Sequence, residues 1–410
     1  MLSKFEKSTN KDVLDYQIRN QLISTLKNRF STYSYQQVRT PTFETYDMYA
    51  ASTKTVNKDE MIKVIDRSGK VLVLRPDGTI PITKMTATNT EINGSEQRLF
   101  YVLDVFRHSS EDSTDKESTQ AGVELFGNSS PESDAEIIML AIHTLKDIGF
   151  GNFKIEIGHA GFVRELIEQA NLTDQELQQL QDLIQSKNII EMEPFLKNLN
   201  ISSELQEALY AIPLLYGDSE EVLEQTKAII RNDKMQQIFN NLIEVMDVLT
   251  DYNVAEFTTL NLGLINNMYY YTDIIFQGFV ENIGKPVLMG GRYDHLGEQF
   301  GKKMAAIGFA YEIDFLLIAM KQHQLTDSRN QSNPLLLSYE PEMRAQALAT
   351  ANQLRVKDFA VITTPIQKLN ENARINFAND KGRVYINGNK QEFSTTEELI
   401  HLLTLETEVP

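Results

Sequence analysis

The first 150 residues alternate between helical and strand-like patterns of apolar positions. Residues 11–30 place apolar side chains at helical spacing, which predicts an amphipathic helix. An extended segment follows, with Pro41 just inside it. Four short strand patterns come next without helices between them, at 61–66, 70–77, 97–108 and 120–127. Such repetition is typical of antiparallel pairing.

A helix is expected after Pro131, because Ser133 can serve as its N-cap and Glu136 then occupies the capping-box position. From 159 to 253 the chain is rich in leucine, glutamine and glutamate at helical spacing, which predicts a helical insertion. Strand patterns resume in residues 261–279.

A polar stretch at 326–333 predicts a linker to a separate region. That region shows strand, helix, strand, short helix and strand patterns in succession, which indicates a small α/β domain. The predicted domains are an α+β domain made of 1–158 and 254–325, the helical insertion 159–253, the linker 326–333, and the α/β domain 334–410.

The amino-acid composition excludes several kinds of site and partner. The 410 residues include no cysteine, and the six histidines form no pair at i, i+3 or i, i+4, so we expect no disulfide, metal site or cofactor. A net charge of −18 argues against nucleic acid as a main partner. The charged N-terminus lacks the apolar core of a secretion signal, and no apolar run is long enough to span a membrane. We therefore expect a cytoplasmic location and no membrane partner.

The segment 287–317 carries the most specific motif, Gly290-Gly291-Arg292-Tyr293-Asp294 followed by Ala306-Ile307-Gly308-Phe309-Ala310. It resembles the end of the catalytic domain of the histidyl-tRNA synthetase family. The resemblance implies a class II aminoacyl-tRNA synthetase-like fold, in which helices flank an antiparallel sheet. Residues 11–49 resemble the first class II motif, which implies a homodimer interface. Residues 334–410 resemble a shortened anticodon-binding domain, but hold 8 Lys and Arg against 10 Asp and Glu, which disfavours RNA binding.

Four further motifs match, in the family's order, the residues that hold the free amino acid. A zwitterion needs anions for its ammonium, a cation for its carboxylate and a shaped wall for its side chain. In the family an acid and a threonine hold the ammonium, an arginine bridges carboxylate and α-phosphate, and a glutamate addresses the imidazole. By this resemblance the histidine-binding residues are Asp77, Thr79, Arg107, Gln120, Glu124, Tyr270, Tyr271 and Tyr293.

Each residue also has a plainer interpretation. Asp77 precedes a glycine and fits a turn, and Gln120 could lie on a solvated strand face. Tyr270 and Tyr271 alternate faces of a predicted strand, so one of them could be core. Arg292 fits an ion pair that supports the fold better than a ligand contact. The co-occurrence of the motifs in order favours the binding interpretation.

Departures from the family cluster on the nucleotide side. Phe315 stands where the family has the arginine under the ATP triphosphate, and a phenyl ring cannot neutralise a phosphate. Asn266 stands where a second catalytic arginine would precede the tyrosine pair, and Ser118 replaces the aromatic residue that stacks on adenine. The loop before Ser118 is acidic and would repel a triphosphate. We therefore assign no catalytic residue.

A pocket that binds histidine but cannot activate it is a sensor. This combination resembles the family of ATP phosphoribosyltransferase regulatory subunits. The resemblance implies a homodimer within a hetero-oligomer, with the short-form catalytic subunit as partner and L-histidine as effector. It also implies that the chain has no catalysis of its own and serves activation and feedback control in the first step of histidine biosynthesis. Two alternatives stay open, a divergent histidine-tRNA ligase and a synthetase-like interaction module with another partner.

Overall fold

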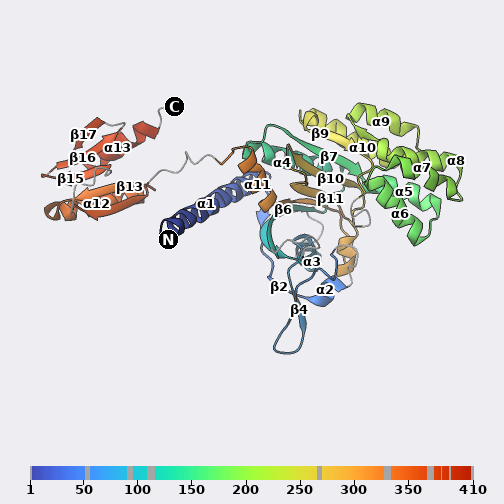
Figure 1. The fold of residues 1–410 in the computed structure, drawn as a ribbon, viewed down its shortest axis with the longest axis horizontal. Helices are drawn as coiled ribbons and strands as arrows, with labels where there is room; N and C mark the ends of the chain where they lie inside the picture. Colours follow the sequence, from blue (N-terminus) through green and yellow to red (C-terminus); the bar gives the residue numbers. More distant parts are fainter. Residues whose placement is uncertain are drawn as a thin grey trace. The chain divides into compact units, whose positions relative to one another are not determined.

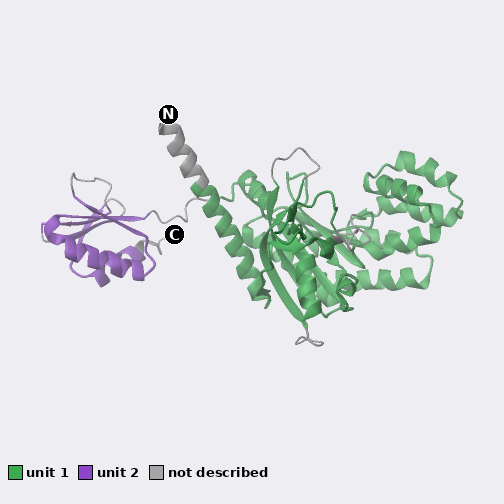
Figure 2. Cartoon of the chain, turned by 90° about the horizontal axis from the view of Figure 1, so that it is seen from below, with its two compact units in different colours: residues 1–326 green, residues 327–410 purple. Residues whose placement is uncertain are grey.

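The computed structural model describes residues 2–50, 56–89, 96–108, 116–265, 270–326, 334–366, 374–379, 381–386 and 389–407. The chain folds into two compact units, residues 1–326 and residues 327–410 (Figure 2). The predicted linker lies outside the described residues except for Thr326, and Asn266 lies outside them too. The same holds for residues 109–115, the centre of the acidic loop.

A mixed sheet forms the centre of the first unit (Figure 1). Within the described residues it has nine strands, in the order β1-β5-β6-β12-β11-β10-β7-β9-β8. The central pairs from β5 to β7 are antiparallel, as predicted, whereas β1 pairs with β5 and β7 pairs with β9 in parallel. The strands are β1 (Gln36–Gln37), β5 (Gln97–Phe106), β6 (Glu117–Phe126), β7 (Phe153–His159), β8 (Tyr216–Gly217), β9 (Thr258–Asn261), β10 (Ile274–Val280), β11 (Leu288–Arg292) and β12 (Ala306–Glu312).

Helix α4 (Pro131–Ile148) is the most buried helix of this unit. Its apolar residues face β7 and β12 of the sheet as well as α1 (Leu2–Thr32) and α10 (Asp233–Asp251), so nearly its whole circumference is apolar. The predicted N-cap, Ser133, is wrong: Ser130 caps the helix by accepting from the Ser133 amide. Pro131 explains the shift, because proline is favoured at the first helical position. Glu136 pairs with Arg98 and makes no capping box.

A small three-stranded sheet lies before β5, in the order β2-β4-β3, with β2 (Phe43–Thr45), β3 (Lys63–Ile65) and β4 (Val71–Leu74). Two helices interrupt this region, α2 (Tyr46–Ala50) and α3 (Thr79–Thr88). Helix α3 lies between the second and third predicted strands, so the prediction of strands without helices between them is wrong there. The β-branched residues of α3 hide its helical pattern, whereas the Asp77 side chain, which accepts from the Ile80 amide at 2.8 Å, marks its start.

Residues between β7 and β9 are mainly helical. The helices are α5 (Ala160–Ala170), α6 (Asp174–Gln185), α7 (Ile189–Asn198), α8 (Ser203–Ala211), α9 (Ser219–Lys227) and α10. The two-residue strand β8 interrupts them and pairs with β9, which the helical pattern does not predict. Farther along, the predicted strand at Tyr270 and Tyr271 is wrong, since β10 begins only at Ile274. Helix α11 (Ile313–Gln322) follows β12 directly.

The second unit contains a five-stranded sheet in its described residues, in the order β14-β13-β15-β16-β17. Helices α12 (Arg344–Val356) and α13 (Thr396–Thr407) pack against each other and against this sheet. The short helix predicted after the second strand would fall mainly on residues 367–373, which lie outside the described residues, and residues 374–379 contain β15. The strands are β13 (Leu335–Tyr339), β14 (Val361–Pro365), β15 (Ile375–Ala378), β16 (Lys381–Ile386) and β17 (Asn389–Phe393).

Candidate functional site

One cavity of about 860 Å³ lies in the first unit and brings together all eight residues of the predicted histidine site. Its floor is the face of β6 and β12 on which Glu124 pairs with Gly308 and Gln120 pairs with Glu312. Successive strand residues face opposite sides, so the motif residues at even positions share this face. The β6 motif thus turns both of its polar side chains into the cavity.

Glycine is required on this floor because large polar side chains cross it. A Cβ added at Gly308 would lie 2.0 Å from Glu124 Oε2, and one at Gly122 would lie 2.5 Å from the Tyr101 hydroxyl. Neither position has room for a side chain while Glu124 and Tyr101 keep their places. The glycines therefore let these side chains reach across the sheet.

Glu124 is the polar centre of the cavity. Its side chain is buried, accepting from Thr79 Oγ1 at 2.7 Å on one oxygen and from the Tyr293 hydroxyl on the other. Burial raises the pKa of Glu124 to about 8, although these hydrogen bonds favour its ionised form. At neutral pH the carboxyl therefore holds its proton for most of the time. A buried carboxyl with a raised pKa in a cavity is a typical feature of a functional site.

The β4–α3 segment places Asp77 and Thr79 beside Arg107. Arg107 Nη2 lies 3.7 Å from Asp77 Oδ2, while its Nε donates to the Pro76 carbonyl at 2.5 Å. Arg107 follows β5, and its amide pairs with the Lys116 carbonyl across the loop. This part of the cavity therefore presents an anion, a hydroxyl and a guanidinium together, which are the groups that a zwitterionic amino acid needs.

Three tyrosines form one wall. The rings of Tyr270 and Tyr293 stack, with centroids 5.5 Å apart and planes 10° apart, and Tyr271 meets Tyr270 edge-on at 4.8 Å. Both Tyr270 and Tyr271 line the cavity, so neither is purely core. They can do so together because the backbone there is irregular and does not alternate faces as a strand would.

The lining residues that sequence reasoning missed include Tyr101, Lys285 and Glu312. Glu312 accepts from Gln120 Nε2 at 2.7 Å, and its burial raises its pKa. The alternation along β12, counted from Gly308, would have placed Glu312 on the cavity face. No comparable signal existed for Lys285, which lies in the connection between β10 and β11.

The opposite end of the cavity contains the departures from the family pattern. Phe315 and Ser118 both line it, and Lys285 Nζ lies 6.0 Å from the centroid of the Phe315 ring. The described residues that line the whole cavity include six acidic side chains, Glu60, Asp77, Glu117, Glu124, Glu312 and Asp314, against three fixed cations, Arg107, Lys116 and Lys285. Five acids still exceed the three cations when the mostly protonated Glu124 is left out. Such a surplus of acid is unfavourable for a triphosphate.

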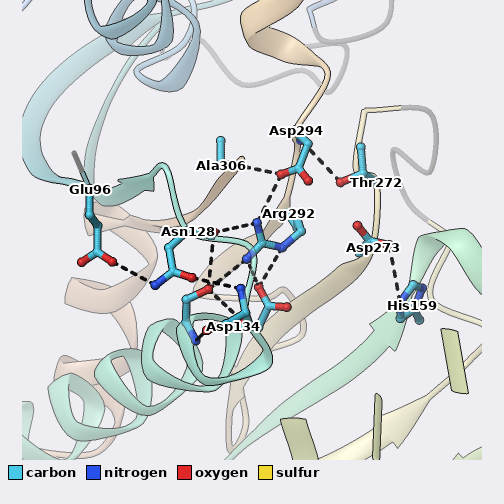
Figure 3. A network of polar contacts seen from close by, with 11 residues as sticks. Glu96, Asn128, Asp134, His159, Thr272, Asp273, Arg292, Asp294 and Ala306 are labelled. Atoms are coloured by element: carbon cyan, nitrogen blue, oxygen red, sulfur yellow. Dashed lines mark hydrogen bonds and ion pairs between the residues drawn. The ribbon is translucent and has the colours of Figure 1, made fainter. Parts of the chain in front are cut away.

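Arg292 supports the fold, as the sequence predicts. Its buried guanidinium donates to Asp134 of α4 at 2.9 Å from Nε, and its Nη1 reaches Asp294 at 3.2 Å (Figure 3). Asp294 in turn accepts from the Ala306 amide at 2.8 Å. This network fixes the end of β11, so Tyr293 is held between two anchored neighbours.

The described part of the chain shows no group of three or more histidine, aspartate or glutamate side chains placed to hold a metal ion. Nor does it contain a helix with the length and apolar character needed to cross a membrane.

The fold and the cavity define a class II aminoacyl-tRNA synthetase-like protein, which confirms the predicted fold class. A family model described as histidyl-tRNA synthetase matches residues 11–316. The structure is similar to a histidyl-tRNA synthetase from Nostoc sp. PCC 7120, with a TM-score of 0.78, 16% identity and coverage of 95% of this chain and 96% of that one. At that identity the likeness shows the fold alone.

Sequence relatives place the chain more narrowly. An ATP phosphoribosyltransferase regulatory subunit from Oceanobacillus iheyensis is 49% identical over 356 residues, which cover 86% of each chain. Another from Ruminiclostridium cellulolyticum is 36% identical and covers 89% of this chain and 87% of its own. The chain belongs to the ATP phosphoribosyltransferase regulatory subunit family. A solved Bacillus halodurans C structure, an ATP phosphoribosyltransferase regulatory subunit/histidyl-tRNA synthetase, has a TM-score of 0.76 and 28% identity, covering 87% of this chain and 90% of that one.

Proposed function

We propose that this protein is a non-catalytic regulatory subunit that binds free histidine and controls a separate ATP phosphoribosyltransferase catalytic subunit. In this role it is required for the activity of the short-form catalytic subunit and for its feedback inhibition, in the first step of histidine biosynthesis. One observation carries the proposal: the cavity keeps a full set of groups for an amino acid, while Phe315 and the surplus of carboxylates oppose a nucleotide.

In the proposed complex, histidine lies on the β6–β12 floor. Asp77 and Thr79 hold its ammonium, Arg107 faces its carboxylate, and Gln120 and Glu124 contact its polar atoms. Glu124 already accepts hydrogen bonds from two hydroxyls of the protein, which makes it an organised partner for an imidazole. The tyrosine wall covers a flat aromatic ring by stacking.

Catalysis is opposed by charge. Activation of an amino acid requires cations at the triphosphate, and single electrostatic contacts of that kind are worth roughly 3 to 4 kcal/mol in a transition state. Here Phe315 supplies none, and Glu312 and Asp314 immediately precede it. We therefore propose that the chain has no catalytic activity of its own.

Charge also opposes tRNA as a partner. Residues 159–253 hold 17 acidic and 6 basic residues, which accounts for a net charge of −11 out of −18. Binding of a polyanion relies on lysine and arginine, so this region would repel an acceptor stem. The proposed partners are protein chains, a second copy of this chain and the short-form catalytic subunit, in a hetero-oligomer.

Reconstitution tests the proposal. The short-form catalytic subunit would be purified alone and with this chain, and phosphoribosyl transfer to ATP would be assayed with and without L-histidine. We expect activity only in the complex, inhibition by histidine, and a complex containing Glu124→Gln that is active but less sensitive to histidine. Failure of the two chains to co-purify, or equal activity without this chain, would contradict the proposal. Normal inhibition of the Glu124→Gln complex would place the feedback site elsewhere.

A further inference from the structure

We propose that Arg164, on the first helix of the insertion, is a positioning residue that sets Tyr271 against the ligand and couples the cavity to the helical insertion. The inference rests on the proposed histidine binding and adds a residue outside the predicted site. Arg164 is half-buried on α5 and does not line the cavity. Its Nη2 donates to the carbonyl oxygen of Tyr271, whose ring does line it.

Two hydrogen bonds and one close approach from the start of α5 hold the backbone of residues 271–273. Besides the Arg164 contact, the Ala160 amide donates to the Asp273 carbonyl at 2.8 Å. A Cβ added at Gly161 would lie 3.2 Å from the Thr272 carbonyl oxygen. Helix α5 therefore lies so close to this segment that a side chain at position 161 would crowd the Thr272 carbonyl. The segment therefore cannot shift without displacing α5, or α5 without displacing the segment.

The other side of the same segment is held by the end of β11. The Thr272 amide donates to the Arg292 carbonyl at 2.7 Å, and the Asp294 amide donates to Thr272 Oγ1 at 3.4 Å (Figure 3). Arg292 is fixed by its buried ion pair with Asp134. Tyr271 is thus clamped between a rigid anchor on the sheet and the first turn of α5, and only the α5 side leads into the insertion.

The next residue of α5 carries the contact onward. Glu165 accepts from Asn232 Nδ2 at 2.8 Å and pairs with Lys234. Asn232 is the N-cap of α10, and its side chain accepts a hydrogen bond from the Met235 amide at 2.8 Å. Neighbouring residues of α5 therefore contact the cavity wall and the start of α10. If the two sites are coupled, a change at one alters the response at the other.

The test compares parent protein with Arg164→Met, Arg164→Lys and Arg231→Met. Arg231 is the matched control, because its side chain also donates to backbone carbonyls, at Ala228 and Glu204, but only within the insertion. L-histidine affinity is measured by calorimetry, and hydrogen exchange is measured across α5 and α10 with and without L-histidine. The readout is the change in hydrogen exchange that histidine causes. If Arg164 only stabilised the fold, its replacement would leave that change in place.

We expect Arg164→Met to weaken histidine binding by about 2- to 30-fold, the range for residues that carry coupling without touching ligand. Histidine-induced protection of α5 should disappear in this variant. Arg164→Lys, which keeps the charge and a donor, should recover part of both, and Arg231→Met should behave as the parent does. If Arg164→Met loses its cooperative melting transition, Gly161→Ala decides instead, since its methyl group would crowd the Thr272 carbonyl and so disturb the packing of α5 on residues 271–273 without changing charge.

Unchanged affinity and unchanged protection in the deciding variant would overturn the inference. If the parent itself shows no saturable histidine binding, the proposed function fails and the inference fails with it. If the parent binds histidine and the deciding variant binds it equally well with the same protection, only the inference about Arg164 is overturned and the proposed function stands.

Discussion

The two ends of the cavity differ in what they offer a ligand. The end around Glu124 is preorganised: hydroxyls of Thr79 and Tyr293 meet one buried carboxyl, and Asp77 and Arg107 lie 3.7 Å apart nearby. The end around Phe315 has an apolar ring in place of a cation, and carboxylates of Glu312 and Asp314 beside it. This difference is what the proposed function requires, namely recognition of an amino acid without the electrostatics that its activation needs.

The largest expected effect comes from replacing a glutamate by glutamine at each end of the cavity and comparing the two variants. Glu124→Gln should weaken histidine binding by about 10- to 150-fold, because a hydrogen bond to a charged group is worth roughly 1.5 to 3 kcal/mol. Glu117→Gln, the same change at the exposed nucleotide end, should leave affinity within about twofold. Calorimetric titration measures both. Equal losses in the two variants would show that the ends do not differ as described.

The pH dependence of binding should reveal the shared proton of Glu124 and the imidazole. Below a pH of about 6.5 the free imidazole is charged while Glu124 is neutral, so binding must release a proton. Above a pH of about 8 Glu124 is ionised and the free imidazole neutral, so binding must take one up. Affinity should therefore be level between these values and fall up to about tenfold per pH unit outside them.

Glu124→Gln should abolish the upper limit of that window. The parent without ligand should also lose stability as pH rises from 4.5 to about 8, because the folded carboxyl retains a proton that the unfolded chain has released. Titrations between pH 5.5 and 8.5 and melting curves measure these effects. Affinity that continues to rise above pH 8 would mean that only the ionised carboxylate contacts a neutral imidazole.

Asp77 combines a ligand role with a structural one, and two substitutions distinguish them. Asp77→Ala removes both the charge and the cap on α3, so the unliganded protein should lose about 1 kcal/mol of stability. Asp77→Asn keeps the cap, so it should melt like the parent yet respond less to histidine. Denaturant unfolding of both variants with and without L-histidine measures the split. A parent-like histidine response in Asp77→Asn would remove Asp77 from the binding site.

The smallest expected effect is at Phe315. Phe315→Arg restores the cation of the family pattern, but Asp314 and Glu312 lie beside it and can pair with the new guanidinium. We expect histidine affinity within about twofold of the parent. ATP–pyrophosphate exchange should remain undetected. Exchange at ordinary synthetase rates in this single variant would show that one residue, rather than the whole nucleotide end, separates this chain from an enzyme.

Sequence reasoning located the cavity residues well because each came from a motif with defined chemistry. The family resemblance supplied Gln120 and Glu124, and the alternation of side chains along β6 explains why both reach the cavity face. The same alternation applied to β12 would have added Glu312. Arg292 could be assigned to an ion pair, but its partner Asp134 lies on a helix distant in sequence, which pattern cannot supply.

The errors arose where tertiary contacts override local pattern. Tyr270 and Tyr271 have strand-forming side chains, yet hydrogen bonds to α5 and to the end of β11 hold residues 271–273 outside any strand. Helix α3 was missed because its residues favour strands, while a side-chain cap at Asp77 starts it. Ser133 looked like an N-cap, but Ser130 precedes the proline that the helix prefers at its first position.

One calorimetric experiment tests the central claim most directly, that the amino-acid end of the cavity functions and the nucleotide end does not. L-histidine is titrated into the intact chain to saturation, and ATP with magnesium is then titrated into the saturated protein. We expect saturable binding of one histidine per chain, followed by no saturable heat from ATP. A flat histidine titration, or a saturable ATP response after histidine, would contradict the account.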